Sequence, residues 1–261
     1  MVQKITIIGG QGKGGVVEPV QKLELSMGDV VSIVGPTGSG KTTLINDLEL
    51  FACGNTPTGR RVLINDVVPA AEYRNDPSCN PIALITQHTT FLSDLPVAEF
   101  LKTHARIRSK DGKEGELIVE ETLDFANQLT GEAIALESRM TELSGGQTRA
   151  LLIADATIIC NTPIVLLDEV ENAGINRTKA LELLRRYRKI FIFVTHDPRI
   201  ALLSDYRIVM NRGMMTAVLH TNEQEQKLSH KVSLLDDLLT GLREKIRLGQ
   251  RLSGLELEAL A

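Results

Sequence analysis

Short apolar runs of strand length alternate along the chain with segments whose apolar residues recur at helical spacing. Predicted strands occupy residues 5–8, part of 21–29, 30–34, part of 56–66, 82–86, 164–167 and 190–194. The last two are apolar throughout, which is typical of parallel strands covered on both faces, and a helix at 177–188 would connect them as a crossover. Residues 97 to about 159 are mostly helical in pattern, with a polar turn at 109–115. The pattern predicts an α/β fold with a largely helical insertion.

The last 40 or so residues follow a different pattern. Apolar residues there alternate spacings of four and three, as in the seam of a coiled coil: Leu228, Val232, Leu235, Leu239, Leu242 and Ile246. Gly249 is expected to end this helix, and the capping spacing of residues 253–256 predicts a short final helix. Two interpretations remain open, because the seam can pack back on its own domain or stabilise a dimer.

The strongest chemical signal is a glycine-rich loop between the predicted strand 30–34 and a helical segment that starts at Thr43. It fills every fixed position of the phosphate-loop pattern G-x-x-x-x-G-K-[ST], with the residues Gly35, Pro36, Thr37, Gly38, Ser39, Gly40, Lys41 and Thr42. Its glycines let backbone N–H groups face phosphate oxygens at a helix N-terminus. We expect Lys41 to reach the β- and γ-phosphates and Thr42 to hold Mg²⁺. The sequence therefore predicts a nucleotide site that includes Thr43.

A second glycine pattern, G-x-G-x-x-G at residues 10–15, is typical of dinucleotide sites only when its last glycine opens a helix. Here the β-branched residues Val16 and Val17 follow, and Pro19 interrupts the segment. We predict a turn between two strands at this position, with no cofactor role.

Composition narrows the class of protein. Apolar residues make up 43% and charged residues 24%, as in soluble globular proteins. The formal charge of -4 argues against a general nucleic-acid surface, and no nucleic-acid partner is expected. Cys53, Cys79 and Cys160 are scattered, which favours free thiols in a reducing compartment. No apolar run reaches the roughly 18 residues of a membrane span, and no signal peptide is expected, so the chain is predicted to be cytoplasmic.

A carboxylate pair follows the apolar run 164–167. Asp168 at the strand end is placed to hold Mg²⁺ through its water shell, and Glu169 can serve as general base toward an attacking water. Such a pair is weak evidence alone. Downstream of a complete phosphate loop by the length of an inserted domain, it supports nucleotide hydrolysis.

Three further segments resemble the ABC (ATP-binding cassette) ATPases over roughly residues 1–215. The first resembles the family's signature and consists of Leu143, Ser144, Gly145, Gly146 and Gln147. Gln87 is similar in position to the family's Q-loop glutamine, and His196 to its switch histidine. Together with the phosphate loop and the acidic pair, these motifs follow the family's order.

The resemblance implies a P-loop NTPase with a mostly parallel core sheet, N-terminal antiparallel strands and a helical signature subdomain. The cassette would span residues 1–220, with about 88–160 inserted and 221–261 as a helical extension. Two cassettes, identical or related, would close head to tail over two ATP molecules. Ser144 and the Gly146 amide would then contact the γ-phosphate on the partner's Lys41. Gln87 would sense Mg²⁺ and water, and His196 would steady the γ-phosphate.

The chain departs from the family in three places. Residues 1–50 contain no Phe, Tyr or Trp to stack on adenine, which leaves the preference for ATP over GTP open. The stretch 170–175 ends in Ile175, where the family has the aspartate that communicates across the dimer. Asp155 stands where the family has an arginine.

The resemblance leaves two roles open. The first is the ATPase subunit of a membrane transporter, peripheral on the inner face of the membrane through a membrane-spanning permease subunit. Segment 91–97 resembles the stretch that receives a helix from that partner. The second is a soluble ATPase that remodels or activates a protein or assists metal-cluster or cofactor assembly. The unusual stretch 170–175 and the heptad tail favour this alternative.

Overall fold

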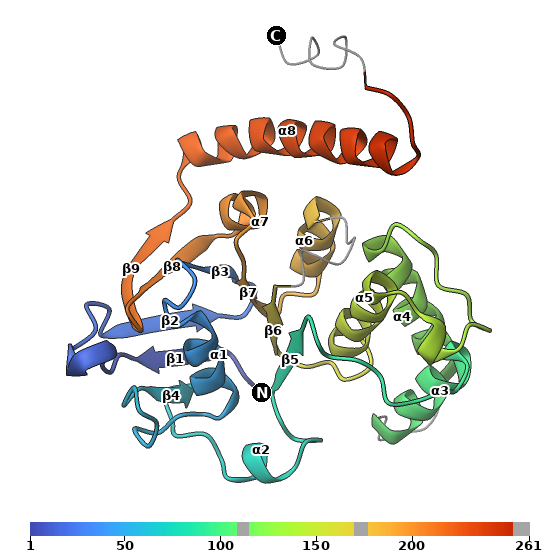
Figure 1. The fold of residues 1–261 in the computed structure, drawn as a ribbon. Coiled ribbons are helices and arrows are strands. Elements are labelled where there is room, and N and C mark those ends of the chain that lie inside the picture. The colour runs from blue at the N-terminus through green and yellow to red at the C-terminus, as the bar shows by residue number, and fades with distance from the viewer. Residues whose placement is uncertain (109–114, 170–176, 253–261) are drawn as a thin grey trace.

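The computed structural model describes residues 1–108, 115–169 and 177–252 (Figure 1). Its larger sheet has six strands in the order β5-β6-β7-β3-β8-β9. Their bounds are β3 (Val30–Val34), β5 (Ile82–Thr86), β6 (Ile164–Asp168), β7 (Ile190–Val194), β8 (Tyr206–Asn211) and β9 (Met214–His220). All neighbours pair in parallel except β8 and β9, which form an antiparallel hairpin. The predicted mostly parallel core sheet is confirmed.

A second, smaller sheet is antiparallel and comes from the N-terminal part of the chain. Its order is β2-β1-β4, with β1 (Lys4–Ile8), β2 (Lys22–Ser26) and β4 (Arg61–Ile64). It confirms the expected N-terminal antiparallel strands.

The helices lie on both sides of the larger sheet, and α3, α4 and α5 gather on one flank of the molecule (Figure 1). Their bounds are α1 (Lys41–Glu49), α2 (Glu72–Asn75), α3 (Val97–Arg108), α4 (Gly115–Leu129), α5 (Gly145–Thr157), α6 (Arg177–Arg186), α7 (Pro198–Leu203) and α8 (Glu223–Arg247). Single 3₁₀ turns, η1 and η2, lie at Lys13–Gly15 and Met140–Glu142. Among the described residues, no helix has the length and apolar character that crossing a bilayer requires.

The apolar strand β6 shows why the core strands carry no polar face. Val165 and Leu167 pack with the helices α3 to α6 on one side of the sheet. Ile164 and Leu166 pack on the other side, with α1 and the small antiparallel sheet. Successive strand residues point to opposite faces, so a strand covered twice must be apolar at every position.

Several predicted bounds need adjustment. The strands at 82–86 and 190–194 are confirmed, whereas only residues 61–64 of the segment 56–66 form a strand and the helix from 177 ends at Arg186. The β8–β9 hairpin was not predicted, although Arg212-Gly213 in its turn has positive φ at both residues, as tight hairpins require. The predictions for the turn at 109–115, for the stretch 170–175 and for a helix at 253–256 concern residues largely outside the described ranges.

Helix α8 contains the whole predicted seam, and Gly249 follows it in a left-handed conformation (φ +71°), as expected for the helix end. Four seam residues nevertheless point to solvent, with exposed fractions of 46–60%: Leu228, Leu235, Leu239 and Ile246. The helix instead contacts α7 through Asp236, whose carboxylate accepts from Arg199 at 2.5 Å. The interpretation in which the seam packs back on its own domain is therefore wrong at these four positions.

Candidate nucleotide-binding site

The predicted site residues follow the carboxyl ends of neighbouring parallel strands. Gly35 follows β3, Gln87 follows β5, Asp168 ends β6 and His196 lies just after β7. The strands are in register, since Thr86 pairs with Asp168 and Asp168 pairs with Val194. Parallel strands bring their carboxyl ends to one edge, so residues up to 161 positions apart in sequence meet there.

The glycines of the phosphate loop are required by its backbone. Gly38 and Gly40 adopt φ values of +74° and +100°, which other residues rarely tolerate. A β-carbon at Gly40 would also lie 2.8 Å from the α-carbon of Gly213 in the β8–β9 turn. Because α1 begins directly afterwards at Lys41, its unpaired N-terminal amides face the loop, as in other phosphate sites.

Lys41 is buried, at 8% exposure, and its ammonium lies inside the loop. Nζ donates to the carbonyl oxygens of Gly35 at 2.9 Å and Pro36 at 3.2 Å. A positive charge held by two neutral carbonyls at the head of a helix is a strong local attractor for a phosphate.

A single cavity of about 770 Å³ joins most of the predicted residues. Its lining includes Thr37, Gly38, Gly40, Lys41, Thr42, Thr43, Gln87, Asp168, Glu169 and His196. Gly35, Pro36 and Ser39 shape the loop but do not line the cavity, and Ser39 is buried. The segment 143–147 does not line it either.

Glu169 and His196 face each other across the cavity. His196 Nε2 lies 3.7 Å from Glu169 Oε1, and the two side chains are 49% and 37% exposed. Glu169 has φ of +51°, an unusual value for a residue with a side chain, and its amide donates to the Val194 carbonyl at 3.1 Å. Such backbone outliers concentrate at functional sites.

The oxygen donors of the cavity suit Mg²⁺. A hydroxyl (Thr42), a side-chain amide (Gln87) and two carboxylates (Asp168 and Glu169) all line it. Mg²⁺ prefers oxygen ligands and is commonly held by one or two carboxylates together with phosphates of the substrate. The donor set therefore fits the ion.

Comparison with known proteins identifies the family. The model of the ABC transporter family matches residues 20–172. The chain is also 48% identical over 252 residues to an ABC transporter ATP-binding protein of Methanocaldococcus jannaschii, which covers 97% of this chain and 95% of that protein. This chain belongs to the ABC transporter ATP-binding proteins. The family binds ATP, and its cassettes serve as the ATP-binding subunits of transporters.

More distant relatives are also ATP-binding proteins, named for import systems. A sulfate/thiosulfate import ATP-binding protein of Agrobacterium fabrum is 32% identical over 75% of this chain, and a spermidine/putrescine import ATP-binding protein of Bacillus cereus is 30% identical over 76%. The chain spans only 57% and 59% of these two relatives.

Solved structures share the fold at lower identity. A dimeric ATP-binding cassette in a post-hydrolysis state with ADP and phosphate has a TM-score of 0.62 at 22% identity, covering 84% of this chain and 99% of that one. A cassette of Clostridium perfringens, part of an ABC transporter complex, has a TM-score of 0.66 at 19% identity, covering 94% and 100%. These neighbours confirm the predicted ABC ATPase fold.

The segment 143–147, predicted to be the signature, spans the start of α5. Ser144 is the N-cap residue: its Oγ accepts from the Gln147 amide at 3.3 Å, while Gln147 Oε1 accepts from the Ser144 amide at 2.9 Å. Ser144 and Gly145 are exposed, and Leu143 packs against the core. The capping box leaves the helix N-terminus turned to solvent, as an anion site supplied to another molecule would be.

The N-terminal glycine segment reaches the nucleotide cavity, which its sequence did not predict. It forms the expected connection between β1 and β2, but Gln11, Gly12 and Lys13 line the cavity together with the phosphate loop. The Lys13 amide donates to the Arg212 carbonyl at 2.9 Å, so the β8–β9 turn holds the segment in place. The predicted exclusion of this segment from the site is not supported by the geometry.

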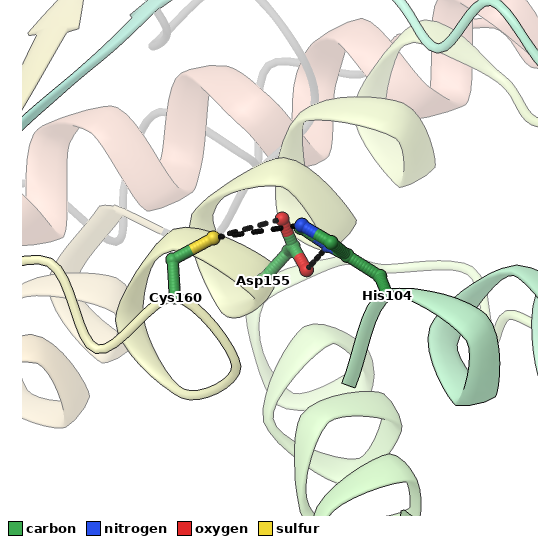
Figure 2. A group of neighbouring side chains, drawn as sticks. All are labelled: His104, Asp155 and Cys160. Carbon is green, nitrogen blue, oxygen red and sulfur yellow. Dashed lines mark hydrogen bonds and ion pairs between the residues drawn. The ribbon is translucent and has the colours of Figure 1, made fainter. Parts of the chain in front are cut away.

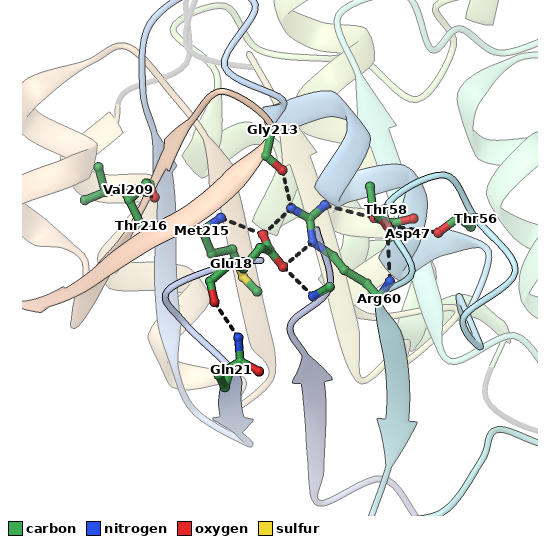
Figure 3. Close-up of polar contacts among 11 residues, drawn as sticks. Glu18, Gln21, Asp47, Thr56, Thr58, Arg60, Val209, Gly213, Met215 and Thr216 are labelled. Carbon is green, nitrogen blue, oxygen red and sulfur yellow. Dashed lines mark hydrogen bonds and ion pairs between the residues drawn. The ribbon is translucent and has the colours of Figure 1, made fainter. Parts of the chain in front are cut away.

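A buried charge network fixes these loops beneath the site (Figure 3). Arg60, fully buried on the approach to β4, pairs with Glu18 at 2.5 Å and with Asp47 of α1 at 2.9 Å. Glu18 also accepts from the Gly10 amide at 2.8 Å, and Arg60 donates to the Gly213 carbonyl at 2.7 Å. One guanidinium thus joins the glycine segment, α1 and the β8–β9 turn.

Proposed function

We propose that this ABC protein hydrolyses ATP with Mg²⁺ at the interface of two cassettes and energises a membrane transporter. One observation carries the proposal. Lys41, Asp168, Glu169 and His196 line one cavity, while the signature segment 143–147 does not line it. A single chain therefore supplies a phosphate site and a separate exposed helix N-terminus, which two copies could combine head to tail.

The residues divide the chemistry as follows. Lys41 and the loop amides bind the β- and γ-phosphates, and Thr42, Asp168 and Gln87 would hold Mg²⁺. The ion, when bound, neutralises charge on the phosphate oxygens. Glu169 accepts a proton from the attacking water as general base.

His196 and the partner's signature complete the site. His196 lies 3.7 Å from the Glu169 carboxylate, from where it can steady the γ-phosphate beside the attacking water. Ser144 and the Gly146 amide of a second copy would cover that phosphate from the other side. Binding of ATP then joins the two cassettes, and hydrolysis releases them.

The transporter role rests on the relatives. The curated relatives include ABC transporter and import ATP-binding proteins, and a permease subunit would be the membrane-spanning partner. On this proposal the protein is cytoplasmic and reaches the membrane through that partner. The alternative to the transporter role is a soluble ATPase that remodels or activates a protein or assists metal-cluster or cofactor assembly.

The first test is the variant Glu169→Gln in Mg²⁺ and ATP. Removing the general base should abolish hydrolysis and leave ATP binding intact, so the variant should elute as a dimer in size-exclusion chromatography. Adding Ser144→Arg should return it to a monomer that still binds ATP, because the bulky cation blocks only the contact in trans. A variant Glu169→Gln that stays monomeric in millimolar Mg²⁺ and ATP would rule out the two-cassette site for this chain.

The second test identifies the partner. The tagged Glu169→Gln protein, expressed at its native level, is purified from fractionated cells in mild detergent. A multi-span protein recovered with it from the membrane fraction in fixed ratio supports the transporter role. A soluble complex without a membrane protein contradicts that role and leaves the hydrolytic proposal standing.

A further inference from the structure

A cluster of three potential metal ligands lies outside the nucleotide cavity, between α3 and the end of α5 (Figure 2). His104 comes from α3, Asp155 from α5, and Cys160 from the segment just after α5. His104 Nδ1 and Asp155 Oδ1 are 2.7 Å apart. The sulfur of Cys160 lies 3.6 Å from Asp155 Oδ2 and 4.0 Å from His104 Nε2.

We propose that Cys160, His104 and Asp155 bind one Zn²⁺ ion. A thiolate, an imidazole and a carboxylate together form a donor set that suits zinc better than Mg²⁺ or Ca²⁺. Zn–S and Zn–N bonds of about 2.3 and 2.0 Å at tetrahedral angles separate sulfur and nitrogen by about 3.6 Å. The three ligand atoms all lie within 4.8 Å of one another, and the distance of 4.0 Å from Cys160 Sγ to His104 Nε2 is a few tenths of an ångström longer than that geometry requires.

The surrounding backbone holds the three side chains in place. The Cys160 amide donates to the Asp155 carbonyl at 2.9 Å, which fixes the two ligands relative to each other. On α3, the neighbours Leu101 and Ala105 are buried in the core at 0% and 3% exposure, which anchors the helix that carries His104. Ligands held on a well-anchored backbone lose little conformational entropy when a metal binds.

The cluster also has an open side. Asp155 and Cys160 line a cavity of about 610 Å³, separate from the nucleotide cavity, between the end of α5 and the start of β5. Three protein ligands with access to such a space leave the fourth position of a tetrahedral ion to water or a small ligand. The site is therefore expected to hold a zinc ion that exchanges with solution.

A proton occupies the site in the absence of metal. The hydrogen bond to Asp155, with a further one from Cys160, raises the pKa of His104 to about 10. Two other charged groups face the cluster: Arg108, whose Nε lies 3.5 Å from His104 Nε2, and the buried Lys189. Metal binding must displace the histidine proton and turn Arg108 aside, so the protein is titrated with metal at pH 8.

The decisive experiment uses Co²⁺ as a spectroscopic probe for the zinc site. Full-length protein is stripped of metal with a chelator and kept reduced, and Co²⁺ is added without nucleotide. Cobalt bound to a thiolate gives a charge-transfer band in the near ultraviolet. Among the residues that line the nucleotide cavity there is no cysteine, so cobalt bound there cannot produce this band. We expect about one equivalent of Co²⁺ to saturate the band and Zn²⁺ to abolish it.

Two variants assign the ligands. Cys160→Ser should remove the band, and His104→Asn should weaken Zn²⁺ binding at least about a hundredfold, because losing a ligand costs more than the 10–100-fold typical of an outer partner. Cys53→Ser is the matched control, since Cys53 is an exposed free thiol outside this cavity, and it should behave as the original protein. Unchanged ATP binding in each variant shows that the protein remains folded.

Alkylation of the unsubstituted protein gives an independent readout. Zn²⁺ should protect Cys160 from iodoacetamide and leave Cys53 and Cys79 as reactive as before, as measured on peptides by mass spectrometry. Equal alkylation of Cys160 with and without Zn²⁺, or a cobalt band that survives Cys160→Ser, would overturn the proposal. These outcomes are independent of the proposed ATPase, because neither readout requires nucleotide.

Discussion

At the scale of single residues, two lysines are expected to differ in how much they contribute to nucleotide affinity. Lys41 and Lys13 line the same cavity, but Lys41 is buried inside the phosphate loop and Lys13 is exposed at its rim. Charge contacts buried from water are worth far more than exposed ones. The two lysines therefore make a matched pair for mutation.

Lys41→Ala is predicted to weaken ATP binding by about 3 kcal/mol, roughly a hundredfold in Kd. Lys13→Ala should change the binding free energy by less than about 1 kcal/mol, because water already screens its charge. Isothermal titration of both variants measures the difference. Equal losses at the two positions would contradict the assignment of Lys41 as the phosphate-binding lysine.

Sequence motifs pointed to residues that line the cavity at positions where the chemistry requires one particular residue type. Residues other than glycine rarely adopt the φ values of Gly38 and Gly40, and the family resemblance pointed to Gln87 and His196. Gln11, Gly12 and Lys13 were missed because their role depends on the β8–β9 turn, about 200 positions later in the sequence. A contact between residues so far apart in the sequence produces no local periodicity or motif spacing from which it could be predicted.

At the scale of elements, the Arg60 network joins loops that no single motif describes. Arg60→Met keeps the unbranched stem of the side chain but removes the guanidinium, which leaves the carboxylates of Glu18 and Asp47 buried without a cation. We predict a loss of about 3–5 kcal/mol in the free energy of unfolding, measured by urea denaturation. The control Lys22→Met breaks the exposed pair with Glu24 and should cost less than about 1 kcal/mol. Similar losses in both variants would show that the network adds no stability beyond a surface pair.

A second element-scale link connects Gln87, just after β5, with helix α5. Arg149 of α5 donates to the Gln87 carbonyl at 2.7 Å and to the Gly145 carbonyl at 3.2 Å. The planar guanidinium can reach both oxygens at once, which a lysine ammonium cannot do in the same way.

Arg149→Lys is therefore predicted to lower kcat for ATP hydrolysis about tenfold and to leave ATP affinity unchanged, because Arg149 does not line the cavity. Steady-state kinetics and a nucleotide titration separate the two effects. Arg139→Lys is the control, since that arginine pairs with Asp94 on the exposed surface of the same helical region. A normal kcat in Arg149→Lys would mean that this link does not position the catalytic groups.

Element types followed from the sequence more readily than their ends. The doubly covered strands at 164–167 and 190–194 were predictable because burial on both faces demands continuous apolar residues. The hairpin strands β8 and β9 were not predicted, since both mix buried with less buried positions, and β9 is the edge strand of the sheet. The orientation of α8 could not be predicted either, because a heptad pattern gives the apolar face of a helix but not the surface it meets.

At the scale of the whole molecule, α8 lies across α7 (Figure 1), and four of its seam residues are exposed to solvent. Leu235 and Leu239 belong to that outward face at 46% and 48% exposure. If the seam stabilises the cassette dimer, burying each leucine would contribute about 1.5–3 kcal/mol.

Leu235→Ser with Leu239→Ser is therefore predicted to raise the dimer dissociation constant at least about a hundredfold in the Glu169→Gln background with ATP. Analytical ultracentrifugation measures it across a concentration series. Leu234→Ser is a close control, because Leu234 is 56% exposed on the same helix but lies outside the seam. An unchanged dissociation constant in the double variant, with ATP binding intact, would show that the two cassettes associate through the nucleotide sites alone and that the seam has no part in the dimer.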